Sequence, residues 1–167
     1  MKQKLALSCA LIHKPDVLIL DEPTTGVDAV SRKEFWEMLQ RLKALGITIL
    51  VSTPYMDEAE LCDRIALIQD GTIMGTATPE NLKAQFNGAL WRYNGTKMFN
   101  ALKIIRGIKE VSSVNSFGQY LHLNTPTELD EDKVLEVLKK AGLNDFELAL
   151  CEPSIEDVFM QKMTEHE

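Results

Sequence analysis

Two short apolar runs on either side of a helical stretch constrain the fold of this chain more than any other feature. Residues 17–20 read Val-Leu-Ile-Leu, and residues 47–51 read Ile-Thr-Ile-Leu-Val. The first run is typical of a parallel strand that is covered on both faces. Between the runs, apolar residues recur at the spacing of one helix face: Phe35, Met38, Leu39, Leu42 and Leu45. A strand, a helix and a strand with tight connections predict a βαβ crossover, and hence a parallel sheet.

Capping signals predict where the helices of this half begin and end. Ser31, with Glu34 three residues later, forms a capping box, so the central helix is expected to begin at Ser31. Gly46 is expected to be its C-cap. Further elements are expected along the same half: helices over 2–13, 56–62 and from Pro79, and strands over 65–68 and 72–75 with a turn at Asp70-Gly71.

The pattern changes from about Gly88 onward. The strands and helices expected there are strands over 90–93, 111–114, 120–123 and 146–150, and helices over 98–105, over 129–141 and after Ser154, which caps the last helix together with Asp157. This order, β-α-β-β-α-β plus a helix, is that of a ferredoxin-like split βαβ domain. The predicted fold is therefore α/β over a domain 1–86, followed by a small α+β ferredoxin-like domain over 88–167.

Charge and composition exclude several classes of protein. With 18 Lys and Arg against 25 Asp and Glu, the net charge of the 167 residues is −7, which counts against a nucleic-acid partner. No apolar run approaches the roughly 18 residues of a membrane span. Cys9, Cys62 and Cys151 are odd in number and far apart, which excludes a disulfide scaffold and shows no metal-binding spacing. We therefore expect a soluble chain in a reducing compartment.

Two adjacent carboxylates, Asp21 and Glu22, directly follow the first predicted strand. In an open α/β sheet, ligands lie outside the carboxyl ends of the strands, and neighbouring side chains of a strand point to opposite faces. One carboxylate can therefore hold Mg²⁺, while the other orients or deprotonates an attacking water. A bare apolar-Asp-Glu pair is more often only a turn that ends a strand. The full string over 21–28, Asp-Glu-Pro-Thr-Thr-Gly-Val-Asp, favours the functional interpretation.

With this string the sequence resembles the ATPase subunit of ATP-binding cassette (ABC) transporters. Residues 18–23 resemble the Walker B strand with its catalytic glutamate, and residues 24–28 resemble the loop that reaches across the dimer in this family. Residues 2–11 resemble the helix after the Leu-Ser-Gly-Gly signature, and residues 49–53 and 55–64 resemble the switch strand and the helix that follows it. Residues 70–71 and 75–80 resemble the end of the cassette. The second half, in which residues 152–159 read Glu-Pro-Ser-Ile-Glu-Asp-Val-Phe, resembles an accessory domain of one subset of these ATPases.

The resemblance implies the C-terminal part of a P-loop-type parallel sheet and a set of residue roles. In the complete subunit, Glu22 would be the catalytic base or water orienter, and Asp21 would help hold Mg²⁺. Asp28 would contact the dimer partner, and Gln3 would approach the nucleotide across the dimer. Two alternatives stay open, because Asp28 is also suited to cap the loop with its side chain, and Gln3 to lie solvated in a first helical turn.

Departures from the family pattern limit what the chain is expected to do alone. It contains no G-x-x-x-x-G-K-[ST] motif and no glutamine loop, and the Leu-Ser-Gly-Gly signature would lie just before Met1. Without the backbone N–H groups of a phosphate-binding loop, the chain alone is not expected to bind ATP tightly or to hydrolyse it, although the complete subunit is. Pro54 stands where the family usually has a His that touches the γ-phosphate, and proline has no donor for it. Slow hydrolysis and hydrolysis supplied by a paired subunit both stay open.

The resemblance also implies partners and a location. The complete subunit would bind ATP and Mg²⁺, and its partners would be a transmembrane permease and a second ATPase subunit. The chain would lie at the cytoplasmic face of the membrane.

One alternative function is a non-catalytic module in which residues 88–163 pair subunits or cap the cassette. Another is an ABC-type ATPase acting on DNA or ribosomes, which the net charge of −7 opposes. Since a truncated parallel sheet exposes an apolar edge, we expect the first half to be marginally stable alone.

Overall fold

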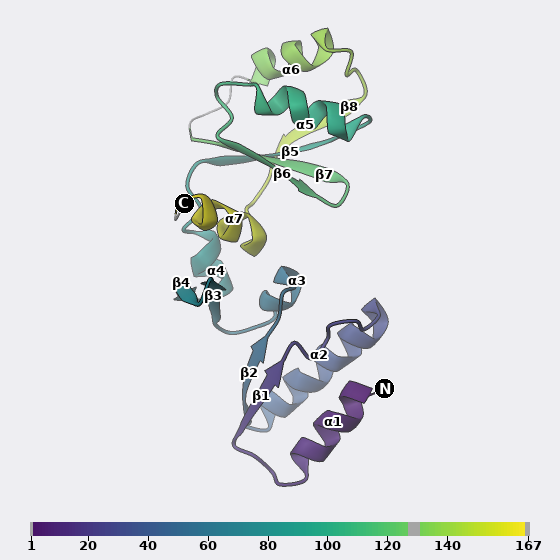
Figure 1. Ribbon diagram of the computed structural model, residues 1–167, viewed down its shortest axis with the longest axis vertical. Coiled ribbons are helices and arrows are strands. Elements are labelled where there is room, and N and C mark those ends of the chain that lie inside the picture. The colour runs from purple at the N-terminus through teal and green to yellow at the C-terminus, as the bar shows by residue number, and fades with distance from the viewer. Residues whose placement is uncertain (1, 127–130, 166–167) are drawn as a thin grey trace. The chain divides into compact units, whose positions relative to one another are not determined.

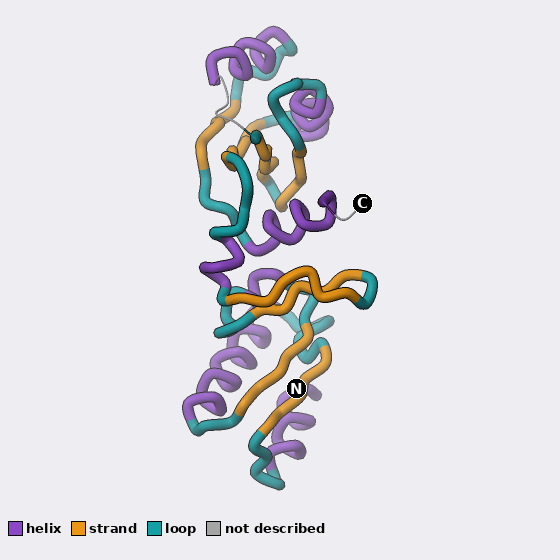
Figure 2. Tube along the Cα trace, turned by 90° about the vertical axis from the view of Figure 1, so that its left-hand side faces the viewer, coloured by secondary structure: helices purple, strands orange, loops and turns teal. Residues whose placement is uncertain are grey.

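The computed structural model describes residues 2–126 and 131–165, which form a mixed α/β fold (Figures 1 and 2). The chain divides into two compact units, Met1–Ile65 and Ala66–Glu167. Leu129 and Asp130, which fall in the predicted helix 129–141, lie outside the described residues. Among the described residues, no helix is long and apolar enough to cross a membrane.

The first unit is built on a parallel strand pair. Strand β1 (Val17–Asp21) pairs with β2 (Thr48–Ser52), and helix α2 (Ala29–Ala44) connects them. The predicted βαβ crossover is thereby confirmed. Helix α1 (Lys2–Leu11) precedes β1, and the short helix α3 (Met56–Ala59) follows β2.

Both long helices of this unit pack on the same face of the strand pair. The buried core joins residues from α1, β1 and α2: Leu7, Leu18, Phe35, Trp36 and Leu39. On the opposite face, Val17, Ile19 and Leu50 are exposed, Ile19 to 71%. The prediction that the first strand is covered on both faces is therefore wrong for the described residues. Its apolar run identified a strand, but a run of this kind carries no information on how many faces are covered.

Helix α2 begins earlier than its capping box predicted. Asp28 is the N-cap, with extended backbone angles, and its carboxylate accepts a hydrogen bond from the backbone N–H of Ser31 at 3.0 Å. Ser31 therefore lies within the first turn, and the predicted start is wrong. Glu34 does not complete a capping box with Ser31 but pairs with Lys4 of α1. A carboxylate is as good an N-cap as a hydroxyl, so Asp28 takes the position.

The second unit contains two sheets. Strands β3 (Ile65–Gln69) and β4 (Thr72–Ala77) pair across a turn in which Asp70 and Gly71 both have positive φ, as the predicted hairpin requires. The larger sheet has the strand order β6-β7-β5-β8, with every neighbouring pair antiparallel. Its strands are β5 (Ala89–Gly95), β6 (Ser113–Phe117), β7 (Tyr120–Thr125) and β8 (Phe146–Leu150).

Helices cover both faces of this antiparallel sheet (Figure 1). Helices α5 (Met98–Arg106) and α6 (Glu131–Lys140) pack on one face, so the elements follow the expected order β-α-β-β-α-β. The core between these two helices and the sheet is apolar apart from the indole N–H of Trp91 and the hydroxyl of Tyr93. Its buried residues are Trp91, Tyr93, Ala101, Ile105, Val114, Leu121, Leu123, Val134, Leu138 and Leu143. Alternate residues of each strand point to this core, as the pleat requires.

Helix α7 (Ile155–Glu165) lies on the opposite face of the sheet. Ser154 and Asp157 cap it reciprocally, as predicted: Ser154 Oγ accepts from Asp157 N at 3.2 Å, and Asp157 Oδ2 accepts from Ser154 N at 2.9 Å. Asp157, 4% exposed, also bonds His122 Nδ1 of β7 at 2.8 Å. Burial alone would raise the pKa of Asp157, but the hydrogen bonds from His122 and Ser154 outweigh it and lower that pKa.

Helix α7 also contacts α4 (Pro79–Lys83), which precedes the antiparallel sheet. Asn87 donates its N–H to Gln161 Oε1 at 2.9 Å and accepts from Gln161 Nε2 at 2.8 Å. Residues from Ala66 onward therefore belong to one compact unit. The predicted domains, 1–86 and 88–167, stay a prediction.

Replacing Asp157 by Asn should destabilise the second unit in a pH-dependent way. Because folding lowers the pKa of Asp157 from 3.8, its ionised form stabilises the fold above pH 3.8, and this contribution is lost as the pH falls through the lowered pKa. We expect Asp157→Asn to lower the free energy of unfolding by about 1–3 kcal/mol near neutral pH, and by less near pH ~3. Urea unfolding followed by circular dichroism measures both values. Glu147→Gln, an exposed carboxylate on β8, is the control, and an equal loss at both pH values would contradict the assignment.

Candidate functional site

The two predicted carboxylates lie at the carboxyl end of β1, and one serine of the neighbouring strand binds both residues. In the parallel register Asp21 is opposite Ser52, the last residue of β2. Ser52 Oγ donates to Asp21 Oδ1 at 2.6 Å. The backbone N–H of Glu22 donates to Ser52 Oγ at 2.9 Å and to Ser52 O at 3.1 Å. The strand pairing therefore sets the positions of Asp21 and Glu22 together.

Glu22 leaves the strand in an unusual backbone conformation. Its φ is +43°, in the left-handed region that residues other than Gly, Asn and Asp seldom adopt. The chain turns back at this point, because Thr25 N–H donates to Glu22 O at 3.2 Å. The hydroxyl of Thr25 also donates to Glu22 Oε2 at 3.0 Å. The Glu22 side chain is exposed, and the loop after it holds its carboxylate.

A third carboxylate, Glu58 of α3, lies buried behind this loop at 2% exposure. Thr24 Oγ1 and Thr53 Oγ1 both donate to Glu58 Oε2, at 2.9 and 2.7 Å. Arg32 Nε donates to Glu58 Oε1 at 2.9 Å. Burial would raise the pKa of Glu58, but the hydrogen bonds from Thr53, Thr24 and Arg32 outweigh it and lower that pKa. Glu58 is therefore held as a carboxylate.

Arg32 joins α2 to the segment after β2. Besides Glu58, its guanidinium bonds both carboxylate oxygens of Asp57, at 3.0 and 3.2 Å. It also lies over the ring of Tyr55, 4.2 Å from the centroid. Sequence reasoning missed Ser52, Arg32 and Glu58. Glu58 and Arg32 are 26 residues apart, and Ser52 and Asp21 are 31 apart, so no local spacing signals these contacts.

The other predicted site residues lie around the same loop, all in the first unit. Asp28 is exposed and caps α2, and the Ser31 backbone N–H lowers the pKa of its carboxyl group. Gln3 lines a small cavity with loop and helix residues: Lys4, Pro23, Thr24, Val27, Ser31 and Phe35. Pro54 is exposed in a turn where Thr53 Oγ1 accepts from Tyr55 N–H at 3.1 Å.

The structure thus brings Asp21 and Glu22 together, and it places Gln3 beside the loop that joins Glu22 to Asp28. The alternative role for Asp28, a capping side chain, is present in the structure. Within residues 2–126 and 131–165, no group of three or more His, Cys, Asp or Glu residues could hold a metal ion. The role of Asp21 in metal binding stays a prediction.

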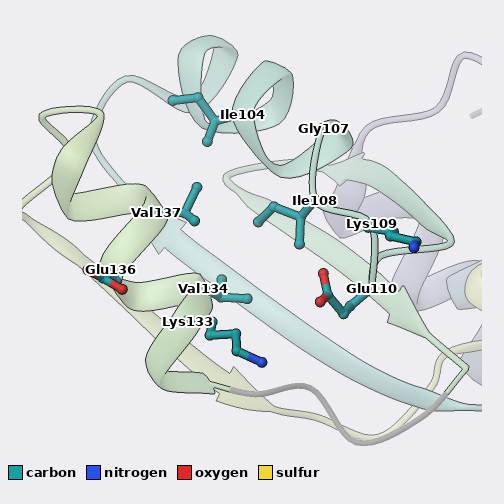
Figure 3. Close-up of a pocket in the computed structure, with 9 residues that line it drawn as sticks. All are labelled: Ile104, Gly107, Ile108, Lys109, Glu110, Lys133, Val134, Glu136 and Val137. Carbon is teal, nitrogen blue, oxygen red and sulfur yellow. The ribbon is translucent and has the colours of Figure 1, made fainter.

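A larger cavity, of about 350 Å³, lies in the second unit (Figure 3). The aliphatic side chains of Ile104, Ile108, Val134 and Val137 face it between α5 and α6. Charged side chains also line it: Lys109, Glu110, Lys133 and Glu136. It contains none of the predicted site residues.

The sequence of the chain is similar to those of several ABC transporter ATP-binding proteins. The chain is 52% identical over 84 residues to the probable multidrug ABC transporter ATP-binding protein YbhF of Escherichia coli, covering 50% of the chain and 14% of YbhF. It is 31% identical over 166 residues to the linearmycin resistance ATP-binding protein LnrL of Bacillus subtilis, covering 96% of the chain and 53% of LnrL. It is 32% identical over 163 residues to the Nod factor export ATP-binding protein I of Bradyrhizobium diazoefficiens, covering 96% of the chain and 51% of that protein.

The chain therefore spans about half, or less, of the length of these relatives. No family model matches it. Among solved structures, CbiO1 from Clostridium perfringens, part of the ABC transporter complex CbiONQ, matches with a TM-score of 0.45 and 34% identity, over 48% of this chain and 33% of CbiO1. The sequence matches confirm the resemblance noted above. The chain is a homologue of ABC transporter ATP-binding proteins and corresponds to part of their ATPase.

Proposed function

We propose that the chain is the C-terminal portion of an ATP-hydrolysing subunit of an ABC transporter. The observation that carries this proposal is the placement of Asp21 and Glu22 at the carboxyl end of a parallel strand, with Ser52 bonded to both residues. In open α/β sheets, that edge is where ligands bind. The extensive sequence similarity to ABC transporter ATP-binding proteins supports nucleotide as that ligand.

Glu22 is the proposed catalytic base or water orienter. Its exposed carboxylate is fixed by the Thr25 hydroxyl and by the turn at positive φ, so it has a defined direction before any ligand arrives. A positioned carboxylate can accept a proton from water, or orient it, for in-line attack on the γ-phosphate of ATP. A glutamate on a flexible loop would be less effective, because its carboxylate would have to be ordered again in each reaction.

Asp21 fits the proposed Mg²⁺ ligand. Mg²⁺ is usually bound by one or two carboxylates together with waters and substrate phosphates, and Asp21 offers an exposed carboxylate at the strand end. The Ser52 hydroxyl donates to Asp21 Oδ1 and so holds the direction of this carboxylate. When bound, the ion would offset the negative charge of the phosphates.

The remaining roles concern partners. We assign Asp28 to the contact with a second ATPase subunit, and Gln3 to the approach toward nucleotide across that dimer. Both side chains border the loop over 22–28, and Asp28 is exposed although it caps α2. We place the chain at the cytoplasmic face of the membrane, where ATP-driven closure of the dimer would move a transmembrane permease. The names of two relatives, which mention multidrug transport and Nod factor export, support a role in transport.

The second domain, 88–167, is proposed to be a ferredoxin-like accessory domain. The strand order β6-β7-β5-β8, with antiparallel pairs and two helices on one face, supports this proposal. Its β-α-β-β-α-β order agrees with the split βαβ pattern.

Replacing Glu22 by Gln should nearly abolish hydrolysis and leave ATP binding in place. The amide keeps the size of the side chain but cannot accept a proton, so we expect kcat to fall by about 100-fold or more. The measurement is steady-state ATP hydrolysis and ATP affinity in a complete ATPase that carries residues 1–167 behind a phosphate-binding loop. Glu37→Gln, an exposed carboxylate on α2, is the control. Wild-type hydrolysis by Glu22→Gln would refute the role.

Replacing Pro54 by His should accelerate hydrolysis in the same complete ATPase. Proline offers the γ-phosphate no donor, whereas an imidazole N–H adds one where charge develops. We expect kcat to rise by about tenfold. Pro54→Ala controls for loss of the proline ring, and equal rates for the His and Ala variants would show that the missing donor does not limit hydrolysis.

A further inference from the structure

Glu58 is a buried carboxylate that no step of the proposed hydrolysis uses. At 2% exposure, its charge would be costly without partners, and the structure supplies them from three parts of the first unit. Thr24 comes from the loop after β1, Thr53 from the segment after β2, and Arg32 from α2. The carboxylate therefore joins the ends of both strands to the helix between them.

One oxygen of Glu58 serves both strand ends. Thr24 and Thr53 donate to the same atom, Oε2, at 2.9 and 2.7 Å. Thr24 is 1% exposed, so its hydroxyl is shielded from bulk solvent and the loss of its partner would be costly. Thr53 directly follows Ser52, the residue that binds Asp21 and the Glu22 backbone. A shift of Glu58 Oε2 would disturb both segments that hold the two site carboxylates.

The link from Glu58 to Glu22 passes through two adjacent threonines. Thr24 is tied to Glu58, and its chain neighbour Thr25 donates its hydroxyl to Glu22 Oε2 at 3.0 Å. The same loop is closed by backbone bonds from Thr25 N to Glu22 O and from Val27 N to Thr24 O. Because Thr24 and Thr25 share a peptide bond, anchoring the first hydroxyl restricts the second.

We infer that Glu58 is a positioning residue that directs the Glu22 carboxylate through Thr24 and Thr25. The Arg32 guanidinium balances the negative charge of Glu58, and Glu58 Oε2 holds the loop after β1 by accepting the hydrogen bond of Thr24. The consequence for ATP hydrolysis rests on the proposed function, whereas the mechanical link between Glu58 and the loop does not. Arg32 also binds Asp57, which lies on the same short helix as Glu58, so Asp57 provides a matched comparison.

The first test uses the 167-residue chain itself and needs no activity. Thr24→Val removes the hydroxyl and keeps the shape of the side chain, whereas Thr24→Ser keeps the hydroxyl. We expect the amides of Thr25 and Val27 to exchange with solvent about tenfold faster in Thr24→Val, and at close to the wild-type rate in Thr24→Ser, measured by NMR. Urea unfolding of each variant separates this local change from a loss of global stability. Equal exchange in the Val and Ser variants would overturn the inference.

A second pair of variants keeps the test decisive if Thr24→Val does not fold. Glu58→Gln removes the charge from the carboxylate that anchors the loop, and Asp57→Asn removes a charge from its neighbour on α3. Faster exchange of Thr25 and Val27 in Glu58→Gln, with wild-type exchange in Asp57→Asn, supports the link. The same exchange in both variants contradicts it.

The second test uses the complete ATPase and separates this inference from the proposed function. We expect Thr24→Val to lower kcat by about tenfold or more with an unchanged KM for ATP, and Thr24→Ser to restore kcat. If loop exchange responds but Glu22→Gln hydrolyses ATP normally, the proposed function is wrong and the positioning link stands. If Glu22→Gln is inactive but Thr24→Val hydrolyses ATP like the wild type, the link has no role in catalysis and the inference fails.

Discussion

The parallel register of β1 and β2 is the constraint on which the first unit depends. It places Ser52 beside Asp21, and the Ser52 hydroxyl then binds Asp21 and the backbone of Glu22. A slip of one residue would turn every side chain of one strand to the other face. A slip in β1 would take Leu18 out of the core, and a slip in either strand would separate Ser52 from the Asp21 carboxylate and the Glu22 backbone N–H. The same pairing therefore builds the core and aligns the candidate site.

In each unit, one buried carboxylate links segments that are distant in the sequence, and hydrogen bonds keep both carboxylates charged. Glu58 is 2% exposed and Asp157 is 4% exposed, yet hydrogen bonds lower the pKa of each despite the cost of burial. Each is bonded by hydroxyl groups and by a basic side chain, Arg32 for Glu58 and His122 for Asp157. A buried charge needs donors on several sides, so each carboxylate draws together segments that are far apart in the sequence.

Much of the secondary structure was predictable, because local patterns carry it. The two apolar runs, the helical stripe between them and the Ser154 cap all reappear in the structure. The first residue of α2 was not predictable, because Asp28 and Ser31 are both good N-cap residues and local patterns do not choose between them. The prediction that the first strand is covered on both faces was also wrong. Whether a strand is covered on one face or two depends on where distant helices pack, and Ile19 is exposed because α1 and α2 both lie on the other face.

For the candidate site, the sequence by itself determined the residue types and their local order. An Asp-Glu pair after an apolar strand, followed by two threonines and a second aspartate, is a local string that the chain carries wherever it folds. Only the tertiary structure decided which partners hold these residues. Ser52 is 31 residues from Asp21 and Glu58 is 34 residues from Thr24, and such contacts arise when a parallel crossover returns the chain to the same edge of the sheet. Hydrogen bonds of this kind depend on distance in space, and sequence spacing does not encode that distance.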